Sequence, residues 1–180
     1  MRMWILATGI AAVAVAAESL RAQVIVGTPS TTPGSPVALV DSNGKVAARP
    51  LNETIMLVAL GSGVVAPAQI RAMYGPDGRA ASGLATWHSG GSVLFTSADC
   101  TTGAHVYSPT QAGVRGAAQV QTAAGIVLFV GAVGSSYTEA IQSILYDTGC
   151  AAVAVRQNGL VPVVATVNLT TTYPPPLSLQ

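Results

Sequence analysis

The sequence predicts an all-β protein, mainly antiparallel, that folds as a sandwich or a barrel-like single domain. From Val37 onward, short apolar runs alternate with turn signals at the spacing that is usual for such folds. Charged residues make up only 8% of the chain, so Ser, Thr, Gln, Asn and Gly must form most of the polar surface.

Three segments carry turn signals that predict hairpins. Residues 41–44 read DSNG, residues 75–78 read GPDG and residues 157–159 read QNG, and apolar runs adjoin each of them. Asn-Gly and Asp-Gly steps tolerate a positive φ at little cost, which tight hairpins require. We therefore expect antiparallel strands beside each segment.

Five further strands are predicted from short apolar runs over residues 54–60, 93–96, 105–107, 119–121 and 126–130. The last run, IVLFV, is apolar on both faces and bounded by glycine, which favours a central strand covered on both sides. The run over 54–60 contains no Lys, Arg or Pro that would protect the edge of a sheet.

Residues 137–146 fit two structures equally well. Ser136 and Glu139 have the spacing of a helix capping box, and apolar residues recur at helical intervals after them. The segment is therefore expected to form either one short helix or a strand.

The first 22 residues have the order of a signal peptide. One positive charge is followed by an uncharged apolar run, and small residues then offer cleavage before Glu18 or, preferably, before Gln23. The apolar run is shorter than the roughly 20 residues that a membrane-spanning helix needs, so no membrane span is expected after cleavage. Residues 23–36, rich in Pro, Ser, Thr and Gly, should form a leader or linker, and residues 37–180 the β domain.

Charge excludes one class of partner. After the predicted cleavage the chain keeps six basic and six acidic residues, spread singly along it. A protein that binds nucleic acid needs clustered Lys and Arg to neutralise phosphates, so nucleic acid is not expected as a partner. A formal charge of zero favours association. The expected partners are a second copy of the chain or a component of the cell surface.

Cys100 and Cys150 are the only two cysteines. In an oxidising compartment an even number of cysteines pairs by default, so a disulfide between them is predicted. No Cys-x-x-Cys pair exists to form a redox-active site. The protein is expected to be secreted or held at the cell surface, in the periplasm or outside the cell.

His88, His105 and Asp99 are the candidates for metal binding or acid-base chemistry. The two histidines are 17 positions apart and lack a ligand at close spacing, so no metal site is predicted. Ser97, His88 and Asp99 could be combined as a hydrolase triad on paper, but no nucleophile motif supports it. Neither catalysis nor a cofactor is expected.

Trp87, Tyr74 and Tyr107 are the candidates for ligand binding. Aromatic rings with a polar edge suit amphipathic ligands such as sugars, and the three could form a stacking surface. The alternative is a Trp87 that packs in the core between sheets.

Four stretches follow one another in a recognisable order: VALVDSNGKVAARP, SVLFTSADCTTGAHVYSP, SILYDTGC and PVVATVNLTTTYPPPLSL. Their order and spacing resemble a loose group of uncharacterised exported bacterial β-domains. In that group an Asp-x-x-Gly turn opens the domain, a strand runs into Asp-Cys-x-x-Gly, and a second Cys follows far downstream. Some members lie downstream of collagen-like repeats, which this chain lacks. The resemblance implies a β fold, a disulfide and export, and it implies no activity.

Two functional hypotheses follow. The first is a structural or adhesive β-domain that acts in assembly at the cell surface or in an extracellular structure, without catalysis. The second is a module that binds carbohydrate or a small ligand around Trp87. An assembly subunit should show an open sheet edge or a large apolar face, whereas a binding module should show an exposed aromatic surface or a pocket.

Secretion of the full chain should yield a mature protein that begins at Gln23, because a small residue precedes this position and a polar residue follows. N-terminal sequencing of the secreted protein measures this directly. Recovery of intact Met1 on a soluble cytosolic protein would contradict both export and the oxidising compartment.

Overall fold

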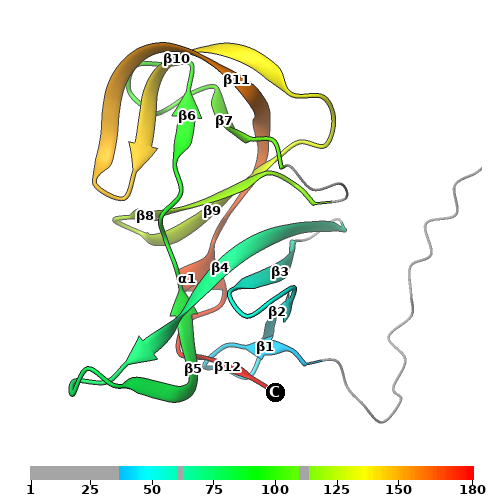
Figure 1. Cartoon of the computed structure of the whole chain (residues 1–180), viewed down its shortest axis with the longest axis vertical. Coiled ribbons are helices and arrows are strands. Elements are labelled where there is room, and N and C mark those ends of the chain that lie inside the picture. The colour runs from blue at the N-terminus through cyan, green and yellow to red at the C-terminus, as the bar shows by residue number, and fades with distance from the viewer. Residues whose placement is uncertain (1–36, 61–62, 110–113) are drawn as a thin grey trace, which may run out of the picture. The chain divides into compact units, whose positions relative to one another are not determined.

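The structure, a computed structural model, describes residues 37–60, 63–109 and 114–180. The predicted signal peptide (1–22) and leader (23–36) lie outside the described residues. The described residues form one compact unit of antiparallel strands with one short helix (Figure 1). The all-β prediction is therefore confirmed.

Six strands close into a barrel in the order β1-β12-β5-β4-β3-β2. Their bounds are Leu39–Val40 (β1), Val46–Pro50 (β2), Ile55–Leu60 (β3), Val64–Tyr74 (β4), Ala80–Trp87 (β5) and Leu177–Leu179 (β12). The strand predicted over 54–60 is β3. It pairs with β4 along its length but with β2 only at Met56 and Leu57.

The other six strands form a second sheet in the order β10-β6-β7-β11-β9-β8. Their bounds are Val93–Phe95 (β6), Ala104–Tyr107 (β7), Ala117–Thr122 (β8), Gly125–Gly131 (β9), Tyr137–Tyr146 (β10) and Gly149–Asn168 (β11). Four of these strands form a closed ring of pairings, in which β10 pairs with β6, β6 with β7, β7 with β11 and β11 again with β10. The first half of the long β11 pairs with β10, and its second half pairs with β7 and β9.

Two of the three predicted hairpins are present. In the first, between β1 and β2, Asp41 Oδ1 accepts hydrogen bonds from the backbone N–H groups of Asn43 and Lys45, both at 2.9 Å. In the second, between β4 and β5, Gly78 has a φ of +74°. A side chain would strain this left-handed backbone, so glycine is favoured there.

The third predicted hairpin, at residues 157–159, is wrong, because β11 runs through them without reversing. Gly159 does have a positive φ of +73°, as the Asn-Gly step predicts. That conformation serves a β-bulge, since the register of β10 against β11 shifts at this point. The chain reverses instead at residues 147–148, between β10 and β11.

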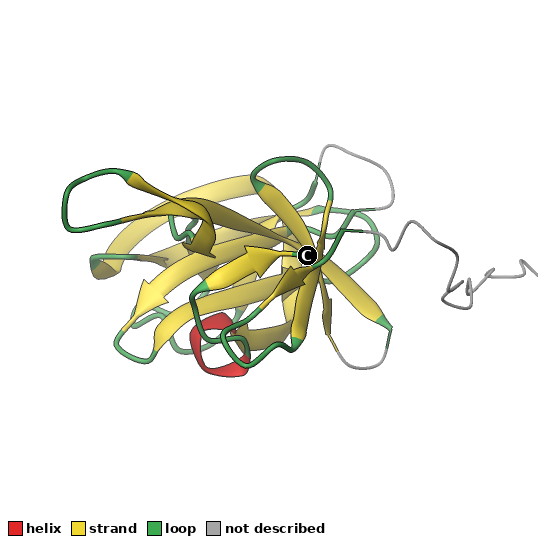
Figure 2. Cartoon of the chain, turned by 90° about the horizontal axis from the view of Figure 1, so that it is seen from below, coloured by secondary structure: helices red, strands yellow, loops and turns green. Residues whose placement is uncertain are grey.

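Residues 137–146 form strand β10, so the strand alternative holds there. The short helix lies elsewhere, at Leu169–Thr172 (α1), and is red in Figure 2. The Asn168 side chain accepts a hydrogen bond from the Thr171 N–H at 3.1 Å and so caps its start. This helix is not among the predicted elements.

The main core fills the barrel and extends to the face of β9 that covers it. Alternate residues of β9 belong to this core, namely Ile126, Leu128 and Val130. Phe129 packs against the smaller core of the second sheet. The strand predicted over 126–130 is therefore packed on both faces, and each fully buried apolar side chain contributes about 1.5–3 kcal/mol.

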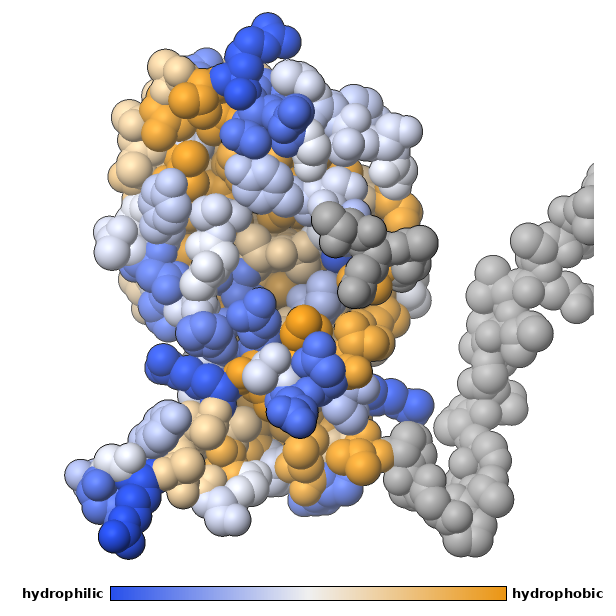
Figure 3. Space-filling view, in the orientation of Figure 1, coloured by the Kyte–Doolittle hydropathy of each residue, from blue (hydrophilic) through white to orange (hydrophobic). Residues whose placement is uncertain are grey.

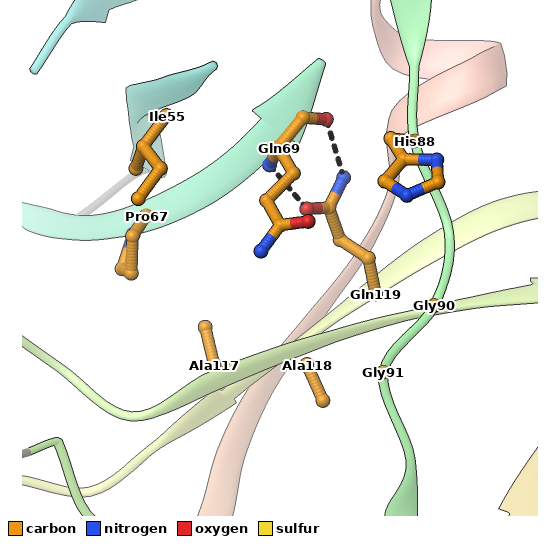
Figure 4. Close-up of a pocket in the computed structure, with 9 residues that line it drawn as sticks. All are labelled: Ile55, Pro67, Gln69, His88, Gly90, Gly91, Ala117, Ala118 and Gln119. Atoms are coloured by element: carbon orange, nitrogen blue, oxygen red, sulfur yellow. Dashed lines mark hydrogen bonds between the residues drawn. The ribbon is translucent and has the colours of Figure 1, made fainter. Parts of the chain in front are cut away.

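One polar side chain joins the second sheet to the barrel. Gln119 of β8 is 6% exposed. Its Oε1 accepts a hydrogen bond from the Gln69 N–H in β4, and its Nε2 donates to the Gln69 carbonyl at 3.1 Å (Figure 4). The Gln119 carbonyl accepts from the N–H groups of Gly90 (3.3 Å) and Gly91 (2.9 Å). We call the bonds among these four residues the glutamine clasp.

Replacement of Gln119 by Ala should lower the free energy of unfolding by about 1–3 kcal/mol, because the backbone N–H of Gln69 loses its partner. Urea denaturation measures the change. Gln69→Ala is the matched control and should cost much less, since the exposed Gln69 side chain is not part of the clasp. Equal losses in the two variants would contradict the role of the Gln119 amide.

Candidate functional site

Trp87, the centre of the predicted ligand-binding surface, lies in the barrel core. Its side chain is 1% exposed, and its Nε1–H donates to the Tyr173 carbonyl at 2.9 Å. The centroids of the two rings are 6.4 Å apart. The hydrogen bond satisfies the one polar atom of the indole, as burial requires. Trp87 therefore packs in the core, as the alternative to a ligand-binding role predicted.

The two tyrosines of the predicted surface are exposed but lie on different sheets. Tyr74 ends β4 of the barrel and is 68% exposed, whereas Tyr107 ends β7 of the second sheet. Tyr74 lines a wide cavity of about 460 Å³ with Thr86 and Pro176. Because Trp87 is buried, the structure does not bring the three rings together on one surface.

The two cysteines form the predicted disulfide. Cys100, in the loop after β6, is bonded to Cys150 near the start of β11, with their Cα atoms 6.0 Å apart. The buried Ser143 of β10 braces the same loop. Its Oγ accepts from the Cys100 N–H at 3.0 Å and donates to the Ser97 carbonyl at 2.6 Å. The disulfide and this serine together fix the loop against the second sheet.

Asp99 and Ser97 are used within that loop. The Asp99 carboxylate accepts from the Thr101 hydroxyl at 2.7 Å. Hydrogen bonds from the side chains of Thr101 and then Ser97 hold the pKa of Asp99 below its usual value. Ser97 Oγ accepts from the backbone N–H groups of Thr101 and Thr102. Both side chains thus stabilise the turn before β7.

His88 lines a cavity of about 210 Å³ between the barrel and the second sheet, beside the glutamine clasp (Figure 4). Its Nδ1 is buried and has no hydrogen-bond partner among the described residues. Among the described residues, the lining holds no carboxylate, thiol or hydroxyl side chain, and neither Ser97 nor Asp99 belongs to it. The structure therefore does not bring His88, Ser97 and Asp99 together as a triad. His105 lies elsewhere, and its Nδ1 is 2.8 Å from the Gly103 carbonyl.

The ribbon formed by β10 and the first half of β11 has an open strand edge. Within the described ranges, no strand pairs with the other side of β11 before Leu160. Residues 151–155 of this strand read AAVAV, and all except Val153 are exposed. We call residues 151–155 the β11 edge. Figure 3 shows apolar surface over the ribbon, at the upper left.

Two other kinds of site are absent from the part of the chain that the structure describes. No three His, Cys, Asp or Glu side chains there are grouped as a metal ion would require. No helix among the same residues has the length and apolar character needed to cross a membrane.

Comparisons with protein-family models, with curated proteins and with solved structures find nothing that matches this chain. No activity or residue role is therefore transferred from a relative. The function has to follow from the features described above, and the β11 edge is the one that offers an uncharged open strand edge.

Replacement of both Cys100 and Cys150 by Ser should lower the free energy of unfolding by about 4 kcal/mol on the chain-entropy model, because the bond joins residues 50 positions apart and restricts the unfolded chain. Thermal unfolding of the oxidised wild type and the double variant gives the difference. Ser143→Ala keeps the bond and should cost less, about 1–3 kcal/mol. A melting temperature that does not change with reductant would contradict a structural disulfide.

Proposed function

We propose that this protein is an exported structural β-domain that associates with copies of itself, at the cell surface or in an extracellular assembly. The observation that carries the proposal is the β11 edge, an uncharged run of five residues that has no neighbour on one side among the described strands. The outward N–H and C=O groups of such an edge are a template for another strand.

The outer edge of β8, in the same sheet, is protected against pairing with another strand. On the outer side of β8, the Gln121 N–H donates to Asp147 Oδ1 at 2.7 Å, and the glutamine clasp occupies the Gln119 carbonyl. The β11 edge carries no charge and no Pro, which are common protective devices. The β11 edge does contain a β-bulge, because its register against β10 shifts between Ala152 and Val155. A bulge bends the strand, so a partner strand must bend with it.

Charge favours an antiparallel pairing of two copies. The exposed Arg156 directly follows the β11 edge. Parallel strands in register would place the two Arg156 side by side, about 5 Å apart. Antiparallel strands place them just beyond opposite ends of the five-residue edge, about 20 Å apart, where salt screens most of their repulsion. This arrangement is two-fold and closed, so it builds a dimer that links two exported chains.

Three further observations support the proposed setting and the association. The N-terminal order of charge, apolar run and small residues is typical of export. The disulfide between Cys100 and Cys150 is compatible with an oxidising compartment. A balanced formal charge adds little repulsion between copies.

Ala154→Lys should weaken self-association about tenfold or more, because it places a charge on the β11 edge in both copies. Light scattering of the secreted protein over a wide concentration range measures the dimer fraction. The exposed Ala154 lies in the bulge, so the substitution should leave the fold intact.

Gln142→Lys is the matched control, since it adds the same charge to an exposed position of the same ribbon, on β10. It should leave the dimer fraction unchanged. A wild type that stays monomeric at every concentration would overturn the proposal. An equal loss of dimer in Ala154→Lys and Gln142→Lys would show that the β11 edge is not the contact between copies.

A further inference from the structure

The barrel wall opens where β2 meets β3. Only two residue pairs join these strands, Arg49 with Leu57 and Pro50 with Met56. The residues of β2 that precede them pair with β1 alone. Beyond the two pairs, a cavity of about 330 Å³ lies between the strands. We call it the barrel groove.

The lining of the barrel groove is mostly apolar: Val46, Ala47, Ala48, Arg49, Leu57, Ala59, Val65 and Tyr173. Val46 is 57% exposed and Val65 is 44% exposed, so apolar surface is left in contact with solvent. Ligand sites in proteins have this volume and this mixture of apolar walls with a few polar groups. The groove therefore has the dimensions and the character of a site for an apolar chain.

Two cations lie beside the groove. Arg49 lines it directly, and Lys45 Nζ lies 4.5 Å from the ring centroid of the lining residue Tyr173. In the described part of the chain neither forms an ion pair, and the pair that is present joins Arg79 to Asp77. Asp41 is buried, its Oδ1 accepts from backbone N–H groups of the first turn, and its Oδ2 has no hydrogen-bond partner among the described residues, so neither cation is bonded to it there. Lys45 Nζ also donates to the Thr172 carbonyl at 3.5 Å, and this one bond leaves its other N–H groups, like those of Arg49, available to an anion.

We propose that the barrel groove binds an anionic amphiphile with one acyl chain, such as a free fatty acid. The apolar chain would lie along the groove wall between Val46 and Val65. The carboxylate would lie near Arg49 and Lys45, whose opposite charge complements it. This inference is independent of self-association, because the groove belongs to the barrel and the β11 edge belongs to the second sheet.

Isothermal titration calorimetry of the secreted protein tests the groove with laurate and with its neutral analogue dodecanol, below the concentrations at which they aggregate. Arg49→Ala and Lys45→Ala should each weaken laurate binding about tenfold, as expected for the loss of one charge-assisted contact, and leave dodecanol binding unchanged. Ala59→Trp, at an exposed position of the wall, should fill the groove and abolish binding of both.

Arg71→Ala is the control, because it removes an exposed cation from β4 that does not line the groove. It should bind both ligands as the wild type does. Three results would overturn the proposal. Laurate could bind no more tightly than dodecanol, or Ala59→Trp could bind both ligands as the wild type does. The protein could also bind phosphatidylglycerol vesicles without binding laurate. Ala154→Lys should keep wild-type affinity for laurate, so failure of this inference is distinguishable from failure of the dimer.

Discussion

The glutamine clasp is the constraint on which the arrangement of the two sheets depends. The barrel and the second sheet share no strand, so no ladder of backbone hydrogen bonds runs between them. The apolar contact across β9 drives the sheets together, but hydrophobic contact has no direction. A side-chain amide carries the same donor and acceptor as a peptide group, so Gln119 can pair with Gln69 as a neighbouring strand would. A Cβ at Gly91 would lie 2.9 Å from the Gln119 backbone nitrogen. The backbone at this position can therefore lie so close to β8 only because the residue is glycine.

Much of the fold could be predicted because its signals are local. The turns at 41–44 and 75–78 join strands that are adjacent in sequence, and the same few residues determine both the turn and the pairing. The prediction was wrong at 157–159, although Gly159 has the expected backbone conformation. A left-handed glycine fits either a reversal or a bulge, and the long-range pairing with β10 and β7 decides between them. The alternatives at 137–146 were likewise decided by neighbours on both sides of β10.

The candidate sites were less predictable than the fold. The disulfide follows from the number of cysteines together with the predicted oxidising compartment, whereas the place of Trp87 depends on which strands enclose it. Ser143 and Gln119 were missed because a buried polar side chain looks like any other serine or glutamine in the sequence, and its role comes from partners far along the chain. The β11 edge is visible as an apolar run, but its lack of a neighbour on one side is a property of topology.

The pairing of β12 with β1 determines when the barrel can be finished. Leu39 pairs with Leu179, and Ala38 and Gln180 exchange two backbone hydrogen bonds of 2.9 Å. A chain that emerges from its N-terminal end delivers β1 to β5 early, yet these five strands can form only an open, curled sheet until residues 177–179 arrive. Contacts between such distant positions form slowly, because the intervening chain must first lose its freedom. The topology therefore delays completion of the barrel until β12 has emerged.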